Sequence, residues 1–272
     1  MIPAPFTYKR AGTVDEALDL AAEAGEDAKF LAGGHSLMPL MKLRLAVPET
    51  LVDIGRLSEL SYVRQADGHV EVGALTCHDD LARSDVLRSA VPLLAHAAGQ
   101  VGDPQVRHCG TIGGSLAHAD PAADLPAVVL ALDATLVIRG PGGSREVAAD
   151  GFFEGLFETV LAPGELLTEI RIPKPRSAGW SFQKLTKRGI DWAIVGVAVQ
   201  GSNVALVNMG STPVRAAGVE QALAAGAGAS DAAAHAADGT SAPDDLNGPR
   251  AYREHLARVL VGRALEESAA RA

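Results

Sequence analysis

The chain has 272 residues, of which 47% are hydrophobic and 21% are charged, and its formal net charge is −9. That length suffices for two modest domains, and an acidic chain without a lysine- and arginine-rich stripe is not expected to bind nucleic acid. Its two cysteines are too few to hold an iron–sulfur cluster or a thiolate metal site, so redox chemistry in this chain would need an organic cofactor.

The first predicted elements are a helix and a strand. Thr13 and Glu16 form a capping-box pattern ahead of an apolar stripe that ends near Gly25, which predicts a helix. The stretch AKFLAGG, residues 28–34, predicts a short buried strand that enters a glycine turn. A helical or irregular segment follows, and then a strand over TLVDIG, residues 50–55.

The middle of the chain alternates between strands and helices. A strand over HVEVG precedes a helix for which Thr76 is the expected N-cap, and Pro92 is expected to start another helix. A second glycine turn and a polar loop then lead to a helix headed by Pro126. Strands over ATLVIRG, residues 134–140, and ELLTEIRIP, residues 165–173, complete this region.

After Pro175 the pattern changes to strand, loop, strand and strand, followed by a helix over GVEQALAAG. Residues 226–249 are rich in Ala, Gly and Asp and are expected to be partly mobile. The last helix is amphipathic, and its predicted apolar face comprises Tyr252, Leu256, Val259, Leu260 and Ala264. We therefore expect the main domain boundary near residue 175.

Two glycine segments carry the strongest functional signal. They are AGGHS, residues 32–36, and TIGGS, residues 111–115. Glycine lets backbone N–H groups approach a ligand closely, and successive N–H groups can form an anion-binding concavity. One such turn is an ordinary structural feature, but two of them with hydroxyl residues suit a dinucleotide. Neither matches the Rossmann fingerprint or a P-loop, so the architecture must be a different one.

A family resemblance rests on five stretches in order: AGGHSLMPLMKLRL, TIGGSLAHADPAADLPAVVLALDATL, ELLTEIRIP, RGIDWAIVGVAV and PVRA. Together they resemble the FAD-binding medium subunit of the xanthine dehydrogenase/carbon monoxide dehydrogenase family of molybdenum hydroxylases. The resemblance implies an α+β fold. A two-part PCMH-type FAD-binding domain would occupy residues 1–175, with parts of about 1–55 and 56–175. A smaller sheet-plus-helix domain would occupy residues 176–272.

The resemblance also implies a function. The chain would bind FAD noncovalently and act as an electron-transfer oxidoreductase subunit. Electrons would pass from a molybdopterin large subunit to [2Fe-2S] clusters on a small subunit, and from there to the FAD of this chain. The final acceptor would be NAD, oxygen or a quinone-linked acceptor. The three subunits would assemble as a dimer of heterotrimers. Neither molybdopterin nor clusters would sit on this chain. We expect it to be cytoplasmic, since MIPAPFTYKR lacks a signal-peptide core and no apolar run is long enough to span a membrane.

The resemblance extends to a set of cofactor-binding residues, with no catalytic side chain and no metal ligand. Both glycine segments would wrap the pyrophosphate and the ribityl chain. Asp124 would accept a hydrogen bond from a ribose, and Lys184 would approach the cofactor. A one-residue slip in the alignment would move the role of Lys184 to Gln183 or Lys187. The full set is Leu31, Ala32, Gly33, Gly34, His35, Ser36, Leu37, Val101, Thr111, Ile112, Gly113, Gly114, Ser115, His118, Asp124, Leu167 and Lys184.

Other interpretations stay open at this point. A GGH sequence also suits a stand-alone flavin oxidase or reductase with FAD linked covalently to His35, and a scaffold subunit that has lost its flavin is a further alternative. His118 either caps its loop or contacts the cofactor. Arg188 and Asp191 are expected to form a salt bridge that orders their loop. His78, His96 and His108 show no partner pattern and are expected at the surface or in helix packing.

Overall fold

The N-terminal part is a small parallel sheet with one crossing helix. In the computed structural model, which describes residues 2–272, strands β1 (Thr7–Arg10) and β2 (Ala28–Leu31) both pair in parallel with β3 (Thr50–Asp53). Helix α1 (Val14–Ala24) connects the first two, because a parallel pair needs a crossover. The Thr13 hydroxyl accepts a hydrogen bond from the Glu16 N–H at 3.1 Å, which confirms the predicted N-terminus.

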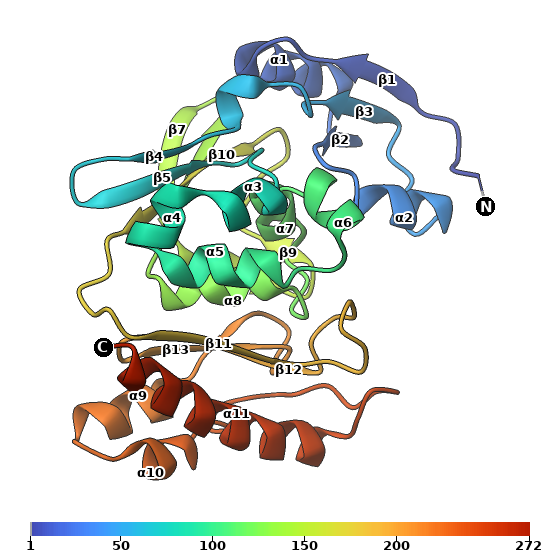
Figure 1. Ribbon diagram of the computed structural model, residues 1–272. Helices are drawn as coiled ribbons and strands as arrows, with labels where there is room; N and C mark the ends of the chain where they lie inside the picture. Colours follow the sequence, from blue (N-terminus) through green and yellow to red (C-terminus); the bar gives the residue numbers. More distant parts are fainter. Residues whose placement is uncertain (1) are drawn as a thin grey trace.

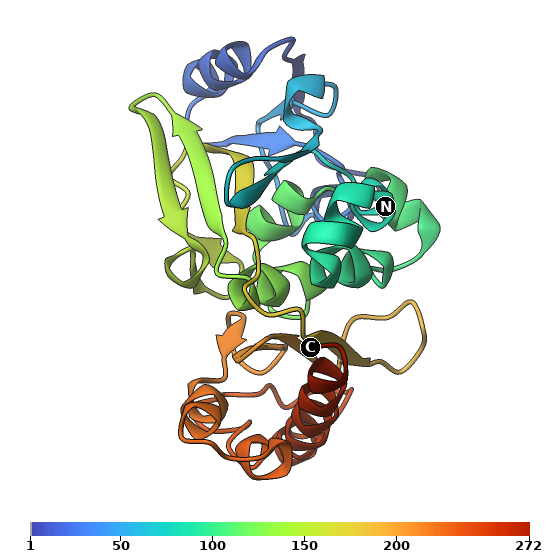
Figure 2. The ribbon, with the colours of Figure 1, turned by 60° about the vertical axis from the view of Figure 1, so that its left-hand side comes forward.

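The central part is a five-stranded antiparallel sheet with helices on one face (Figures 1 and 2). Its strand order is β4-β5-β10-β6-β7. Helices α3, α4, α5, α7 and α8 contribute to a large apolar core on one face of the sheet, and α6 packs on α3. Pro92 starts α5, as predicted. The strands are β4 (Val63–Gln65), β5 (His69–Gly73), β6 (Thr135–Gly140), β7 (Gly143–Ala148) and β10 (Leu166–Pro173). The helices are α3 (His78–Arg83), α4 (Asp85–Ala90), α5 (Pro92–Gly99), α6 (Pro104–Cys109), α7 (Ile112–His118) and α8 (Asp124–Ala131).

Smaller elements complete the central part. A hairpin of β8 (Phe153–Gly155) and β9 (Glu158–Thr159) projects beside α7, and two single 3-10 turns are η1 (Ser58–Leu60) and η2 (Ala149–Gly151). The outer face of the large sheet carries ion pairs, among them Arg171 with Glu146 and Arg64 with Glu71. Charge on this face explains why the helices cover only the other one.

The C-terminal part is a four-stranded antiparallel sheet buried on both faces. Figure 1 shows it lying between α8 above and α11 below. Alternate residues face opposite cores: Val197 and Val199 belong to the C-terminal core, whereas Ala198 packs into the central one. Its elements are β11 (Trp180–Leu185), β12 (Val195–Gln200), β13 (Asn203–Val207), β14 (Val214–Arg215), α9 (Ala217–Ala224), α10 (Ala229–Ala233) and α11 (Arg250–Ala270).

Two local expectations in the central part, and one in the loop after β11, are wrong. Thr76 does not cap α3, because its hydroxyl instead bonds both backbone polar groups of Tyr62, at 3.0 and 3.1 Å. Helix α8 begins at Asp124, which places Pro126 inside its first turn. No ion pair joins Arg188 to Asp191 among residues 2–272; instead the Asp191 N–H donates to the Arg188 carbonyl at 3.0 Å.

A further expectation in the C-terminal part is only partly confirmed. The buried face of α11 comprises Arg253, Ala257, Leu260, Val261, Ala264, Leu265 and Ser268. Leu260 and Ala264 of the predicted face are therefore buried as expected, whereas Tyr252 is exposed. Residues 226–249 contribute Ala232, Ala236 and Ala242 to the C-terminal core, and their partial mobility stays a prediction.

Candidate functional site

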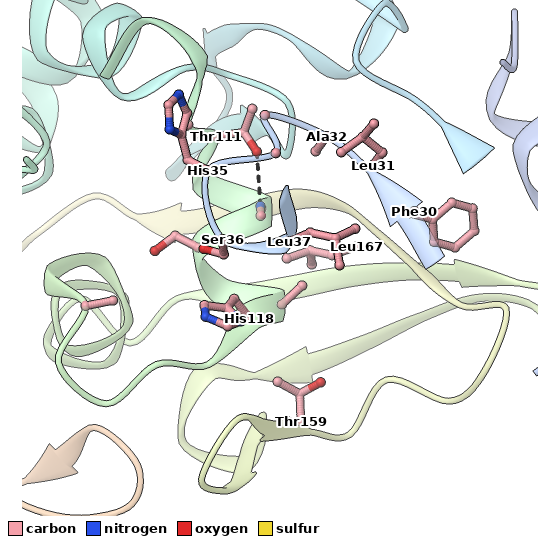
Figure 3. Close-up of a pocket in the computed structure, with 18 of the residues that line it drawn as sticks. Phe30, Leu31, Ala32, His35, Ser36, Leu37, Thr111, His118, Thr159 and Leu167 are labelled. Carbon is pink, nitrogen blue, oxygen red and sulfur yellow. Dashed lines mark hydrogen bonds between the residues drawn. The ribbon is translucent and has the colours of Figure 1, made fainter. Parts of the chain in front are cut away.

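A cavity of about 750 Å³ opens where the three parts of the chain meet. It lies between the end of β2, helix α7, the β8–β9 hairpin and the loop after β11, as the close-up in Figure 3 shows in part. Such a volume is within the range of pockets that bind cofactors and other small molecules. All the sequence-predicted site residues lie on its wall except Ile112, which is fully buried.

The first glycine segment is a loop held tightly against the rest of the wall. A Cβ atom on Gly33 would lie 2.0 Å from the Cys109 carbonyl oxygen, and Gly34 has a φ of +73°, so both positions require glycine. Within residues 2–272, the backbone N–H groups of residues 33–37 donate to no protein acceptor. This loop, followed directly by α2 (Leu37–Lys42), therefore presents a run of free donors at the cavity wall.

The second glycine segment is not the glycine turn that the sequence predicted. It is the first turn of α7, with Thr111 as the N-cap, whose hydroxyl accepts from the Gly114 N–H at 3.1 Å (the dashed line in Figure 3). Gly113 is needed for packing, since a Cβ there would lie 2.5 Å from the Ala74 Cβ. The Ile112 and Gly113 N–H groups bond to Thr76 and Ala74 carbonyls. The helix that this segment opens therefore offers the side chains of Ser115 and His118 to the cavity, and not a run of free amides like that of residues 33–37.

A buried ion pair crosses from the central part to the C-terminal part. The Lys184 Nζ of β11 lies 2.8 Å from the Asp124 Oδ2 of α8, and these side chains are only 6% and 5% exposed. Burial raises the pKa of Asp124 to about 6, against the opposing effect of Lys184. The other carboxylate oxygen, Oδ1, is buried without a hydrogen-bond partner in the described chain. An unpaired carboxylate oxygen in a cavity wall can accept a hydrogen bond from a ligand hydroxyl.

The neighbours of Lys184 point elsewhere. The Gln183 amide bonds the Glu267 carboxylate of α11, and neither Gln183 nor Lys187 lies on the cavity wall. Of the three positions considered from the sequence, Lys184 is therefore the one in the wall. Val101 also lies on the wall and supplies an aliphatic side chain there.

His78 is a wall residue that the sequence analysis assigned to the surface or to packing. It begins α3, is 4% exposed, and its Nδ1 has no hydrogen-bond partner within residues 2–272. Burial, with His35 and Arg107 nearby, lowers the pKa of His78 to about 4. No pattern in the sequence signals this, because the burial arises from packing against Gly110, more than thirty residues further along the chain.

We expect His78 to destabilise the folded chain in acid. The unfolded state binds a proton near pH 6.5 and the folded state only near pH 4, so stability is lost as pH falls through this window. Between pH 6.5 and pH 4, the free energy of unfolding of wild type should fall by up to about 3 kcal/mol more than that of His78→Gln. Urea unfolding of both proteins across that range measures it, and a pH-independent difference would contradict the assignment.

Apolar and aromatic residues at the cavity were also missed by the sequence analysis. His118 packs against Phe157 of the hairpin, with ring centroids 5.0 Å apart, and Phe157 is half exposed at a φ of 59°. Ile190 and Trp192 contribute exposed side chains from the loop after β11. These residues come from segments that are far apart in sequence, so only the fold brings them together.

Two possible features of the chain are not found. Within residues 2–272, no three His, Cys, Asp or Glu side chains are grouped so that they could hold a metal ion. No helix in this range is long and apolar enough to cross a membrane.

Comparison with protein families gives two matches that cover almost the whole chain. Residues 4–175 match the FAD binding domain in molybdopterin dehydrogenase. Residues 180–268 match the CO dehydrogenase flavoprotein C-terminal domain. The same order, an FAD-binding domain followed by a C-terminal domain, is the α+β organisation expected from the sequence.

Individual relatives agree with the family matches over their full length. The carbon monoxide dehydrogenase medium chain of Hydrogenophaga pseudoflava is 42% identical, covering 100% of this chain and 99% of the relative. The glyceraldehyde dehydrogenase medium chain of Sulfolobus acidocaldarius is 37% identical, covering 99% and 100%. A solved structure of the Hydrogenophaga enzyme, in a form that lacks the Mo-pyranopterin moiety, superposes with a TM-score of 0.95 over 100% of both chains, at 42% identity.

Proposed function

The chain belongs to the family of FAD-binding medium subunits of the carbon monoxide dehydrogenase and xanthine dehydrogenase type, and we propose that its cavity holds FAD noncovalently for electron transfer. Members of this family are subunits of oxidoreductases. The proposal extends that membership to the particular residues of this chain that would bind the cofactor.

The free N–H groups of residues 33–37 carry the proposal. A pyrophosphate is a compact dianion, and successive unpaired backbone amides at a glycine loop are a common way to bind one. The glycines keep side chains away, so the phosphates can reach the backbone. The second segment would contribute from its side chains, with the Ser115 hydroxyl on the cavity wall as a donor.

The Asp124–Lys184 pair fits a sugar or ribityl hydroxyl. The unpaired Asp124 Oδ1 would accept the hydrogen bond, and Lys184 would keep the carboxylate ionised and fixed in place. The Leu167 backbone would border the same part of the cofactor. When bound, FAD supplies the redox chemistry itself, so the residues of this chain bind it, orient it and limit the access of water.

The proposed partners are those of the family. The relatives are medium chains of dehydrogenases with further subunits. We place this chain after an iron–sulfur small subunit that receives its electrons from a molybdopterin large subunit, in a dimer of heterotrimers. The relatives named for carbon monoxide and for glyceraldehyde are similar in sequence to this chain, which favours a large subunit as the part that selects the substrate. A cytoplasmic location stays a prediction from the sequence.

Acid precipitation tests the noncovalent binding of FAD. Purified chain incubated with FAD should show bound-flavin absorbance, and trichloroacetic acid should leave the flavin in the supernatant. His35→Ala should retain FAD within about threefold of the wild-type affinity, because the backbone N–H remains in place. Flavin in the pellet would support the covalent alternative at His35. A chain that takes up no FAD would contradict the proposed function.

A further inference from the structure

Asn208 connects two loops that border the cavity. It directly follows β13, is 9% exposed, and adopts a left-handed φ of 61°. Its side-chain Nδ2 donates to the Ala193 carbonyl at 2.7 Å. Its backbone N–H donates to the Pro121 carbonyl at 2.8 Å. One buried residue of the C-terminal part therefore bonds both the loop after β11 and the loop between α7 and α8.

Both of these loops place residues in the cavity wall. Ala193 directly follows Ile190, Asp191 and Trp192, which line the cavity. Pro121 lies between His118 and Asp124, which also line it. The Arg253 guanidinium, fully buried in α11, bonds the next carbonyl of the first loop, at Ile194. The C-terminal end of that loop is therefore anchored, whereas Ile190 and Trp192 themselves remain exposed at the cavity mouth.

We infer that Asn208 is a positioning residue that holds the two loops together across the cavity, and so fixes the wall against which the FAD of the proposed function would rest. It acts through the Ala193 and Pro121 carbonyls and has no need to touch the cofactor. Ordering of the 190–192 segment before binding would raise affinity, because less conformational entropy is then lost on binding.

The residue type suits both parts of this role. Asparagine tolerates the left-handed conformation better than other side chains except glycine, and its amide supplies the donor that Ala193 requires. Glycine at this position would keep the backbone conformation and lose only the side-chain bond. Aspartate would keep the shape but set an acceptor against the Ala193 carbonyl.

Asn203 offers a matched control at the other end of the same strand. Its Nδ2 also reaches the central part, donating to the Ala131 carbonyl at 3.0 Å and to the Asp133 Oδ2 at 2.6 Å. None of these three residues lines the cavity. Asn203→Ala therefore removes a hydrogen bond between the same two parts of the molecule at a distance from the proposed site.

The test compares full-length wild type, Asn208→Gly, Asn208→Asp and Asn203→Ala. The first readout is the FAD dissociation constant from flavin fluorescence, with visible circular dichroism of the bound flavin. The second is hydrogen exchange of peptides covering residues 186–194 and 119–124 in FAD-free protein. We expect Asn208→Gly to weaken FAD binding about tenfold, to change the flavin dichroism and to speed exchange in the 186–194 peptide. The 119–124 peptide should change little, because the N–H of residue 208 still bonds the Pro121 carbonyl. Asn208→Asp should have the same effects more strongly.

Asn203→Ala should leave FAD affinity within about twofold of wild type even if its melting temperature falls. The inference is overturned if Asn208→Gly matches wild type in affinity and exchange, or if Asn203→Ala weakens FAD binding as much. Failure of the proposed function looks different: wild type itself would then bind no FAD. The exchange of the two loops would still test the role of Asn208 in that case.

Discussion

Gly33→Ala is expected to cause the largest loss of FAD binding of any single methyl addition to this chain. The new Cβ would lie 2.0 Å from the Cys109 carbonyl oxygen and 2.8 Å from its carbonyl carbon. Both atoms are backbone at the end of α6, so neither can move aside as a flexible side chain would. The loop of residues 33–37 would be forced off the wall, together with its free N–H donors.

Overpacking of this kind typically costs about 1–3 kcal/mol, which at its upper end corresponds to about a hundredfold weaker binding. Titration with FAD measures the affinity, and thermal unfolding reports whether the chain still folds. Gly142→Ala is the control, because a Cβ there meets nothing within 4 Å. The Cβ of Gly114→Ala would meet the Thr111 hydroxyl at 2.8 Å and the Ala32 Cβ at 4.0 Å, both of them side-chain atoms, and this variant should give an intermediate loss. If Gly33→Ala bound FAD with wild-type affinity, the proposed binding of the pyrophosphate by residues 33–37 would be wrong.

Lys184→Met should destabilise the chain by about 3–5 kcal/mol at pH 7, because it leaves a buried carboxylate without its counter-charge. The loss should shrink in acid. The folded-state pKa of Asp124 is already raised to about 6, and removal of Lys184 raises it further. When the pKa of a carboxyl group is higher in the folded state than in the unfolded state, its contribution to stability is fully present below the unfolded-state pKa. That contribution is lost as the pH rises through the folded-state pKa.

Chemical denaturation between pH 4 and 8 measures this effect. The double variant Asp124→Asn with Lys184→Met should recover most of the stability at pH 7, because neither buried charge remains. Lys9→Met removes a lysine from an exposed pair with Glu23, and should cost under about 1 kcal/mol at every pH. A pH-independent loss in Lys184→Met, or no rescue by the double variant, would contradict a buried ionic link between the two parts.

Local patterns in the sequence were sufficient wherever the cause was local. The capping box at Thr13 and Glu16 fixed the start of α1 because both groups lie within one helical turn. Pro92 marked the start of α5, since proline suits the first turn of a helix and not its interior. The first glycine segment was likewise recognised, because a loop between an apolar strand and a helix is visible in the sequence itself.

The errors occurred where a distant residue decides the outcome. TIGGS was taken for a second glycine turn, although Gly113 is glycine because α7 packs on Ala74. Glycine serves a turn and a close helix contact equally well, so the sequence cannot separate them. The same holds for His78, whose burial depends on Gly110, and for α11, whose buried face includes Arg253 because Asp245 and the Ile194 carbonyl neutralise it. The direct hydrogen-bond role of Thr76 toward Tyr62 had no sequence signal either.

The C-terminal sheet, whose alternate residues enter two different cores, has a consequence for the thermal unfolding of the chain. Strands β12 and β13 contribute side chains to two cores at once. Unfolding of one core therefore removes packing contacts from the other. The region before residue 175 and the region after it should therefore behave as a single thermodynamic unit, with one calorimetric transition. A fragment that ended at residue 175 would expose the apolar surface of α8 that now packs on β12 and β13. The two segments are separate along the chain, but the shared packing of α8 on β12 and β13 makes their stabilities interdependent.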